Sequence, residues 1–387
     1  MSPILPHPLH PGPEALAHSA RLREEINRIL RASGGWIDFS HFMAQALYAP
    51  GLGYYSAGSV KLGGGGDFVT APEMTPLFAR TWARAVAETL QTQPCRQPEV
   101  LELGAGSGRL AHDLLLALDE LGVLPERYLI LEVSADLRAR QETLLATLPA
   151  SLRARVTWCT AWPESLTGVL IANEVLDALP VHRVGWRGDH WVALGVALAG
   201  EDWVWQERPL TDARLMALLP DATGLPVPYD TEICPAAVDL MANLAHSLQA
   251  GRAYFVDYGF PAREYYHPQR ADGTLMCHIR HHAHGDPFAW PGLQDITAHV
   301  DFTAVARAAL QHGLGLEDYR TMASWLIEAG LLDVLADIPV TDEARYLPAV
   351  SAVQKLLSPA EMGELFKVLV LGRGETSPAA RAALGLS

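Results

Sequence analysis

The feature that most constrains this chain is a buried strand that passes through three alternating glycines directly into a helix. The strand is the apolar run 99–103, the glycines are Gly104, Gly106 and Gly108, and a helical pattern follows at 109–121. Glycine reaches positive φ without steric cost, so it suits a tight turn or a close approach of the backbone to a ligand. The sequence therefore predicts a ligand-binding turn at the end of an early strand.

Further strands and helices alternate around this turn. Apolar runs predict strands, and a period of 3.6 residues predicts helices. Their alternation is typical of α/β proteins with a parallel, doubly wound sheet, which binds ligands at the carboxyl ends of its strands. The predicted strands are 99–103, 128–133, 156–159, 168–172 and 253–257, and the predicted helices are 76–90, 109–121, 135–148 and 235–248.

The remaining segments are additions to this core. Helices at 15–30 and 39–47 form a cap, and the glycine-dense segment 50–66 reads as a loop. Residues 259–299 read as irregular, and 303–371 as mostly helical with a final strand. Short runs between 181 and 210 indicate an antiparallel meander, and they carry Trp186, Trp191, Trp203 and Trp205, which we expect to pack on a sheet face.

We expect one large elaborated domain or two domains from the 387 residues. The pattern assigns 1–75 to an N-terminal arm, helical cap and Gly-rich loop, and 183–230 to the inserted meander. It assigns 261–340 to a cleft loop and a helical part. The ligand-binding core is predicted at 76–182 and 231–260, joined by C-terminal elements near 340–375.

The charge balance and the cysteines argue against several classes of protein. The 29 basic and 44 acidic residues give a net charge of -15, which repels nucleic-acid phosphates. The four cysteines lie far apart without a CxxC pair, so neither a zinc knuckle nor a disulfide scaffold is indicated. No targeting peptide is legible, and no apolar run reaches the roughly 18 residues of a membrane span, so we expect a cytoplasmic protein without membrane insertion.

The glycine spacing distinguishes between two cofactors. In the dinucleotide fingerprint G-x-G-x-x-G, the sixth position counted from Gly104 holds Arg109 in place of glycine. The spacing is E-x-G-x-G-x-G from Glu102, which favours S-adenosylmethionine. That cofactor has no pyrophosphate to rest on a helix N-terminus, and needs an approachable backbone and an acidic group near its ammonium. The alternative is that 104–108 is only a tight turn.

An acidic residue at the end of the next strand is the second requirement of such a site. Glu132 follows the apolar run 129–131, where cofactor-binding sheets place a carboxylate on the ribose hydroxyls. The alternative is that Glu132 is a solvated strand end. The predicted cofactor-binding residues of these two strand ends are Glu102, Gly104, Ala105, Gly106, Gly108 and Glu132.

Longer motifs resemble the MidA-type class I methyltransferases, a family that includes a mitochondrial complex I assembly factor. These motifs span nearly the whole chain and are much rarer than a glycine turn. One departure is Ala71, where relatives often carry Ser, which weakens any role for a hydroxyl there. The matching segments are 66–73 (GDFVTAPE), 102–108, 173–180 (NEVLDALP), 257–259 (DYG), 286–287, 295–302 (DITAHVDF) and 366–367.

The resemblance implies a Rossmann-like class I methyltransferase fold with S-adenosylmethionine as cofactor. In the mitochondrial relatives it implies methylation of an arginine of a respiratory complex I subunit, so we expect a protein substrate here. The chain looks like a bacterial relative, and the oligomeric state is left open, a homodimer included. The resemblance also favours Gly66, Asp67 and Thr70 as cofactor-side residues, in a loop that otherwise reads as flexible and solvated.

Polar residues follow the strand 168–172, at the point where class I methyltransferases meet their acceptor. Glu174 is predicted to bind the acceptor, and Asn173 to orient the acceptor or the methionine part of the cofactor. Asp177 lies three residues after Glu174 and would share its face in a helical turn. We predict these three as catalytic residues. The alternative is that Asn173 and Asp177 only cap the turn before Pro180.

Four further residues are predicted to contact the acceptor: Glu73, in the loop before the helix 76–90, Asp257 and Tyr258, after the returning strand, and His299. The nearby segment with Cys277, His278, His281, His282, His284 and Asp286 invites a zinc site. Only His278 and His282 have helix-turn spacing, and the segment reads as an irregular loop. We therefore predict no metal and place this segment beside the acceptor cleft.

Three functions remain to be distinguished. The first is an active methyltransferase acting on a protein arginine. The second is an assembly chaperone or binding module whose S-adenosylmethionine site is vestigial, against which the intact Glu102, glycines and Glu132 speak. The third is a nicotinamide oxidoreductase, which Arg109 disfavours.

Overall fold

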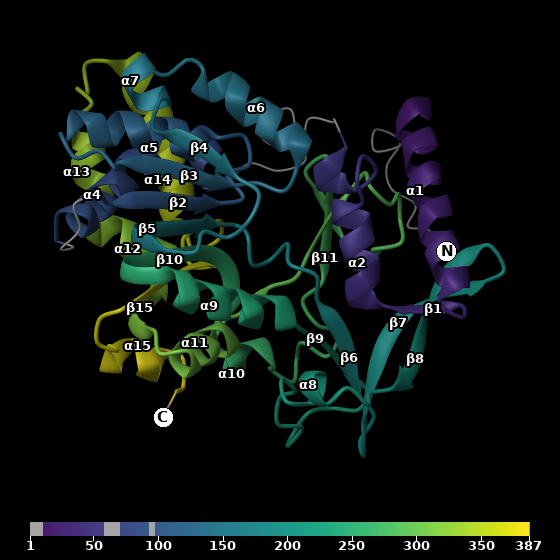
Figure 1. Cartoon of the computed structure of the whole chain (residues 1–387). Coiled ribbons are helices and arrows are strands. Elements are labelled where there is room, and N and C mark those ends of the chain that lie inside the picture. The colour runs from purple at the N-terminus through teal and green to yellow at the C-terminus, as the bar shows by residue number, and fades with distance from the viewer. Residues whose placement is uncertain (1–10, 58–69, 93–96, 387) are drawn as a thin grey trace.

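The computed structural model describes residues 11–57, 70–92 and 97–386. Within these ranges, no helix is both long enough and apolar enough to cross a membrane. Gly66, Asp67 and Cys95 lie outside the described residues. Figure 1 shows two lobes, one built on a large sheet covered by helices and the other on a smaller sheet beside the N-terminal helices.

The large sheet has eight strands and confirms the predicted α/β class. Its order is β15-β16-β10-β5-β2-β3-β4, and β14 pairs with β10. The five strands from β10 to β4 run parallel, whereas β16 is antiparallel to both β10 and β15. The strands are β2 (Glu99–Leu103), β3 (Arg127–Leu131), β4 (Val156–Cys159), β5 (Leu166–Asn173), β10 (Leu248–Phe260), β14 (Val300–Asp301), β15 (Gly315–Thr321) and β16 (Phe366–Gly372).

Both faces of this sheet are buried, which explains why its parallel strands read as nearly continuous apolar runs. Val100 and Leu101 are neighbours on β2, and they belong to separate hydrophobic cores on opposite faces. One core is covered by α4 (Pro76–Thr92), α5 (Arg109–Glu120), α6 (Ala135–Leu145), α7 (Ala150–Arg153), α12 (Met322–Glu328), α13 (Leu331–Ala336) and α14 (Glu343–Leu357). The other is covered by α9 (Pro235–Ser247), α11 (Phe302–Gln311) and α15 (Pro378–Ala383).

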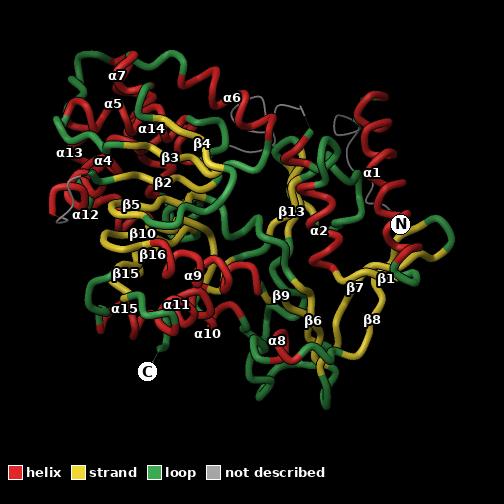
Figure 2. The backbone as a smooth tube through the Cα atoms, viewed as in Figure 1, coloured by secondary structure: helices red, strands yellow, loops and turns green. Residues whose placement is uncertain are grey.

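The smaller lobe contains a five-stranded antiparallel sheet (Figure 2). The Trp-bearing segment forms three of its strands, and the sheet also takes one strand from the N-terminal region and one from after position 228, so it extends beyond the predicted meander 183–230. Its strands are β1 (Trp36–Asp38), β6 (His182–Trp186), β7 (Trp191–Ala199), β8 (Asp202–Pro209) and β9 (Tyr229–Ile233). It packs against α1 (Pro13–Ala32), α2 (Phe39–Tyr48) and the 3₁₀ turn η2 (Tyr54–Ser56).

Two expectations for the C-terminal half were wrong. The segment 259–299 is not irregular throughout, because it contains a small antiparallel sheet of β11 (Met276–Ile279), β12 (His282–His284) and β13 (Asp295–Thr297). These strands are too short to show a clear alternation. The segment after 303 also contains the strand β15, whose charged side chains Glu317 and Arg320 pair with Arg252 and Asp318. The short helices α3 (Ala71–Met74), α8 (Ala213–Met216) and α10 (Ala262–Tyr265) complete the described elements.

Candidate functional site

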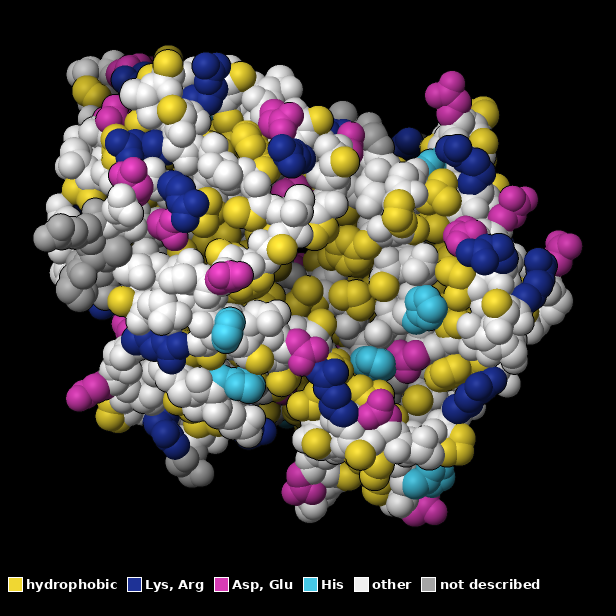
Figure 3. Space-filling view, in the orientation of Figure 1, with side chains coloured by type: hydrophobic (Ala, Val, Ile, Leu, Met, Phe, Trp, Pro, Cys, Tyr) yellow, Lys and Arg dark blue, Asp and Glu magenta, His cyan; other side chains and the backbone are white. Residues whose placement is uncertain are grey.

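A cavity of about 570 Å³ opens at the carboxyl edge of the large sheet. In Figure 3, hydrophobic side chains gather in the hollow between the two lobes. The size is within the usual range for a small-molecule site. Among the residues that line it are Tyr48, Tyr55, Thr70, Glu73, Glu102, Gly104, Ala105, Gly106, Glu132, Asn173 and Glu174, so residues predicted from separate strand ends share one cavity.

The glycine turn presents its backbone to this cavity. Gly104, Gly106 and Gly108 have φ angles of +58°, +55° and +85°, which glycine adopts more readily than other residues. A side chain at Gly104 would also crowd Val175, since its Cβ would lie 3.3 Å from Cγ2. Gly104 and Gly106 line the cavity together with Ala105. Gly108 does not line the cavity; it lies at the N-cap position of α5.

Glu102 is a buried carboxyl near the end of β2, with 3% of its surface exposed. Burial raises its pKa to about 7, although a hydrogen bond from the Tyr128 hydroxyl, 2.7 Å from Oε2, opposes that rise. A carboxyl in this state is half ionised at neutral pH. A cation bound next to it would favour the carboxylate form.

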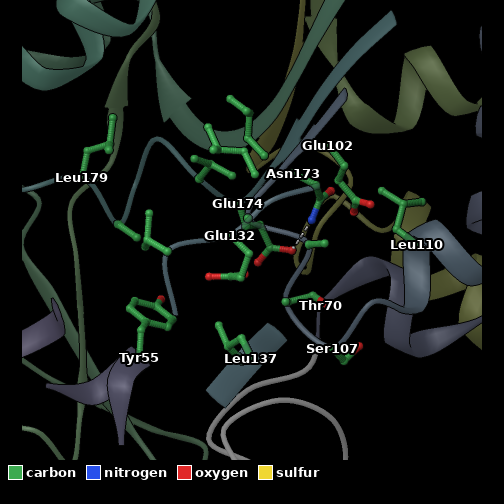
Figure 4. A pocket seen from close by; sticks show the side chains of 18 of the residues that line it. Tyr55, Thr70, Glu102, Ser107, Leu110, Glu132, Leu137, Asn173, Glu174 and Leu179 are labelled. Atoms are coloured by element: carbon green, nitrogen blue, oxygen red, sulfur yellow. Dashed lines mark hydrogen bonds between the residues drawn. The ribbon is translucent and has the colours of Figure 1, made fainter. Parts of the chain in front are cut away.

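Glu132 lies directly after β3 and is held in a fixed orientation. Its Oε1 accepts the Ser134 backbone amide at 2.8 Å, and its Oε2 accepts the side-chain amide of Gln141 at 2.9 Å. Figure 4 shows Glu132 and Glu174 in the cavity with Glu102 beyond them. Glu132 therefore lies in the cavity at the end of β3, and its ribose-binding role stays a prediction.

Gln141 on α6 was not predicted. Its Nε2 contacts both the Glu132 carboxylate and the Gly106 carbonyl oxygen, the latter at 3.0 Å, while its Oε1 accepts Trp158 Nε1 at 2.9 Å. It is fully buried. No local pattern identifies it, because a lone Gln on a helix gains this role only from the elements packed around it.

Asn173 and Glu174 lie together at the end of β5. The Asn173 amide donates to Glu174 Oε1 at 3.0 Å, as the dashed line in Figure 4 shows. The Asn173 Oδ1 atom is buried and has no hydrogen-bond partner in the described part of the chain. Glu174 has a φ of +54°, which is strained for a residue with a side chain and often marks a functional position.

The environment of Glu174 is acidic. Burial, together with the nearby carboxylates Asp177 and Asp295, raises its pKa to about 8. Burial also raises the pKa of Asp177 to about 6, with the Tyr258 hydroxyl opposing the rise. This acidic end of the cavity suits a cationic ligand group.

Asp177, Asp257, Tyr258 and His299 do not line the cavity. Asp257 lies behind the loop that carries Glu174: its Oδ2 accepts the backbone amides of Leu176 at 2.8 Å and Asp177 at 3.2 Å. Tyr258 packs edge-on against His299, with ring centroids 5.1 Å apart. Burial lowers the pKa of His299 to about 4, so it is neutral at physiological pH. The structure therefore leaves these four predicted site residues outside the cavity, and Asp257 supports the loop that carries Glu174.

The segment just before α4, which includes α3, also contributes to the cavity. Thr70 lines the cavity and Glu73 accepts a hydrogen bond from the Ser107 hydroxyl of the glycine turn. The turn and this segment are therefore in contact. The other predicted loop residues, Gly66 and Asp67, lie outside the described residues.

The His-rich segment is not gathered into a metal site. Cys277 lies opposite His284, and His278 lies opposite Ala283, in the antiparallel register of β11 and β12. Among the described residues, no three or more His, Cys, Asp and Glu side chains are grouped to hold a metal ion.

The cavity fits S-adenosylmethionine. The cofactor carries an ammonium and a sulfonium, and Glu102, Glu132 and Glu174 provide carboxyl groups along the lining. The glycine turn leaves room for close backbone approach. The buried, unpartnered Asn173 Oδ1 is an acceptor available to a donor group on the ligand.

Comparison with known proteins supports this assignment. Residues 81–320 match the family model described as "Putative S-adenosyl-L-methionine-dependent methyltransferase". The crystal structure of a Burkholderia thailandensis protein bound to S-adenosyl-homocysteine is 48% identical, with a TM-score of 0.90, and the match covers 95% of this chain and 96% of that one.

More distant relatives carry a more specific name. The mitochondrial protein arginine methyltransferase NDUFAF7 of Danio rerio is 28% identical over 367 residues, which cover 86% of this chain and 82% of the relative. The Homo sapiens protein is 26% identical over 376 residues, covering 88% and 80%. The family match spans more than half of the chain, so this protein belongs to the MidA-type family of S-adenosylmethionine-dependent methyltransferases, and S-adenosylmethionine is its cofactor.

Proposed function

We propose that this methyltransferase acts on an arginine side chain of a protein. The observation that carries the proposal is the acidic end of the cavity, where Glu174 lies close to Asp177 and Asp295. A guanidinium is always positively charged near neutral pH and binds carboxylates through several N–H donors. The NDUFAF7 relatives, which are named protein arginine methyltransferases, support the same substrate class.

The bound cofactor supplies a methyl group on a sulfonium for an in-line displacement. The residues of the chain position the acceptor and receive its proton. Glu174 accepts an N–H of the guanidinium and orients one nitrogen toward the methyl carbon. As the acceptor nitrogen takes the methyl group, Glu174 would accept the proton that this nitrogen loses. With a pKa of about 8, Glu174 is mostly protonated in the ligand-free protein at pH 7. A bound guanidinium favours its carboxylate form, which is then a stronger base than an ordinary carboxylate.

The protein partner is proposed from the resemblance. A subunit of a respiratory complex is the first candidate, because the family includes a mitochondrial complex I assembly factor. We further propose that this chain meets its substrate in the cytoplasm.

The test is methylation of cell-extract proteins with a labelled methyl donor, followed by mass spectrometry of the modified residue. We expect labelled arginine with the wild type and at least about 100-fold less with Glu174→Gln, which loses a charge-assisted contact and the base. Glu361→Gln, at an exposed position, is the matched control.

Binding of S-adenosylhomocysteine separates the outcomes. If Glu174→Gln binds it within about twofold of the wild type, the lost turnover reflects the acceptor side. Donor binding without any labelled protein favours the assembly-factor function, and label on another residue type overturns arginine as the acceptor.

A further inference from the structure

Two tyrosines of the smaller lobe form a wall of the cavity that the sequence did not reveal as a site. Tyr48 ends α2 and Tyr55 lies in η2, and both are half-buried and line the cavity. Their rings stack, with centroids 5.5 Å apart and planes 21° apart. In Figure 4, Tyr55 lies on the side of the cavity away from Ser107 and Leu110, which belong to the cofactor-binding turn and the helix after it.

The hydroxyl groups of both tyrosines are already engaged by the protein. Tyr48 donates to the Ala178 carbonyl oxygen at 2.8 Å. Tyr55 lies 3.0 Å from each carboxylate oxygen of Asp295. The rings are therefore held in place, and what they offer a ligand is aromatic surface.

This aromatic surface lies beside concentrated negative charge. Asp295 is 2% exposed, and Asp177 is 5% exposed. Both raise the pKa of Tyr48 and of Tyr55, in addition to the effect of burial. Among the described residues that line the cavity, the only Lys or Arg is Arg109, which lies 3.7 Å from Asp113 on α5. The tyrosine wall therefore has carboxylates near it and no described cationic lining residue of its own.

We infer that Tyr48, Tyr55 and Asp295 determine acceptor specificity by selecting a planar guanidinium over the ammonium of lysine, an inference that rests on the proposed function. A guanidinium stacks on aromatic faces and is weakly hydrated, whereas an ammonium is a compact, strongly hydrated charge. The ring surfaces receive the faces of the guanidinium and Glu174 receives its N–H edge, while the buried charge of Asp295, which does not line the cavity, favours a cation there. Tyr48 and Tyr55 are thus specificity residues, and Asp295 positions Tyr55.

The ring of Tyr55 can be replaced without losing the hydrogen bonds that hold the backbone of its turn. Ser134 Oγ donates to the Tyr55 carbonyl oxygen at 2.5 Å, and the same residue's backbone amide binds Glu132. Gly53 and Ala57 are tied by a backbone hydrogen bond of 2.9 Å around the turn. These contacts involve no part of the Tyr55 ring, so Tyr55→Leu removes aromatic surface while leaving the turn anchored.

The experiment is a calorimetric titration of full-length protein saturated with S-adenosylhomocysteine. The probes are two blocked tripeptides, Gly-Arg-Gly and Gly-Lys-Gly. We expect the wild type to prefer the arginine peptide by at least about tenfold. Tyr55→Leu and Tyr48→Leu should each reduce this preference by about 3- to 30-fold, mainly by weakening the arginine peptide. Tyr55→Phe, which keeps the ring, should reduce it by less.

Tyr319→Phe is the matched control, because its hydroxyl is buried, lies outside the cavity and has no partner in the described part of the chain. All variants should bind S-adenosylhomocysteine within about twofold of the wild type, which shows that they are folded. A variant that fails this check is replaced by the other leucine variant. Equal or undetectable binding of the two peptides by the wild type, or an unchanged preference in both leucine variants, overturns the inference.

The two proposals fail in different ways. If the wild type methylates arginine in the extract but both leucine variants keep its arginine preference, only the inferred role of Tyr48 and Tyr55 is overturned. If the extract is methylated on lysine, or if no protein is methylated, the proposed function is overturned. The inference about the tyrosines is then overturned as well, because it rests on that function.

Discussion

The side-chain amide of Gln141 donates a hydrogen bond to the Glu132 carboxylate, with Nε2 2.9 Å from Oε2. The same nitrogen lies 3.0 Å from the Gly106 carbonyl oxygen. One buried side chain therefore joins the turn after β2 to the carboxylate after β3. These are the two strand ends at which we predict the cofactor to bind.

Gln141→Ala should weaken S-adenosylhomocysteine binding by about 5- to 50-fold, because both groups lose a buried hydrogen bond of about 1–2 kcal/mol. Calorimetric titration measures the change. Thr143→Ala, on an exposed position of the same helix, is the control and should bind as the wild type does. Unaltered affinity in Gln141→Ala would show that Glu132 keeps its orientation without this amide.

Donor affinity should rise as the pH increases from 6 to 8. The pKa of Glu102 in the ligand-free protein is about 7, and a cationic ligand favours the ionised form. Tyr128→Phe removes a hydrogen bond that lowers this pKa, so the rise should move to higher pH. Dissociation constants at several pH values measure it, with Tyr254→Phe as a buried control tyrosine. If the wild type and Tyr128→Phe had identical pH profiles, Glu102 would not be the group whose ionisation controls donor affinity.

The ligand-free protein should lose stability as the pH rises from about 5 to 8. The pKa of Glu174 is raised from its ordinary 4.5 to about 8, so its neutral form favours folding at low pH and this contribution is lost as the pH rises through the folded-state value. Glu174→Gln should therefore be more stable than the wild type at pH 9 by roughly 1–3 kcal/mol, and similar to it near pH 5. Urea unfolding at both pH values checks this, and Glu361→Gln should show no such difference.

The Glu174→Gly variant should be more stable than the Glu174→Ala variant. The backbone there has a φ of +54°, so Glu174→Gly relieves strain that Glu174→Ala retains, by about 1 kcal/mol. Both variants should lack methylation activity. Comparing the two unfolding curves cancels the effect of the lost carboxyl, and equal stabilities would mean that the positive φ costs nothing at this turn.

Asp257→Asn should disturb the acceptor loop while leaving the donor site intact. The Asp257 carboxylate accepts the backbone amides of Leu176, Asp177 and Tyr258, and an asparagine amide would point a donor at one or more of them. We expect a loss of about 2–4 kcal/mol in unfolding free energy and reduced methylation. S-adenosylhomocysteine binding should stay within about threefold of wild type. Asp333→Asn, which removes a surface charge paired with Arg84, is the control.

The cofactor half of the site could be predicted because its residues follow from local rules. A strand, a glycine turn and a helix must be contiguous, so Glu102, Gly104 and Gly106 are visible in one short segment. Parallel strands end at one edge, which brings Glu132, Asn173 and Glu174 to the same cavity. The family motifs add the loop before α4, of which Thr70 and Glu73 are described.

The acceptor half depended on packing between segments far apart in the chain. Tyr55 meets Asp295 across 240 positions, and Tyr48 meets Ala178 across 130. No periodicity or spacing links such residues, and the Gly-Tyr-Tyr segment by itself reads as a loop. Strand alternation and glycine spacing therefore determined the strand ends at which the methyl donor is predicted to bind. The surroundings proposed for its acceptor were decided by the packing of the smaller lobe against the sheet, because side-chain hydrogen bonds and desolvation exist only in the folded chain.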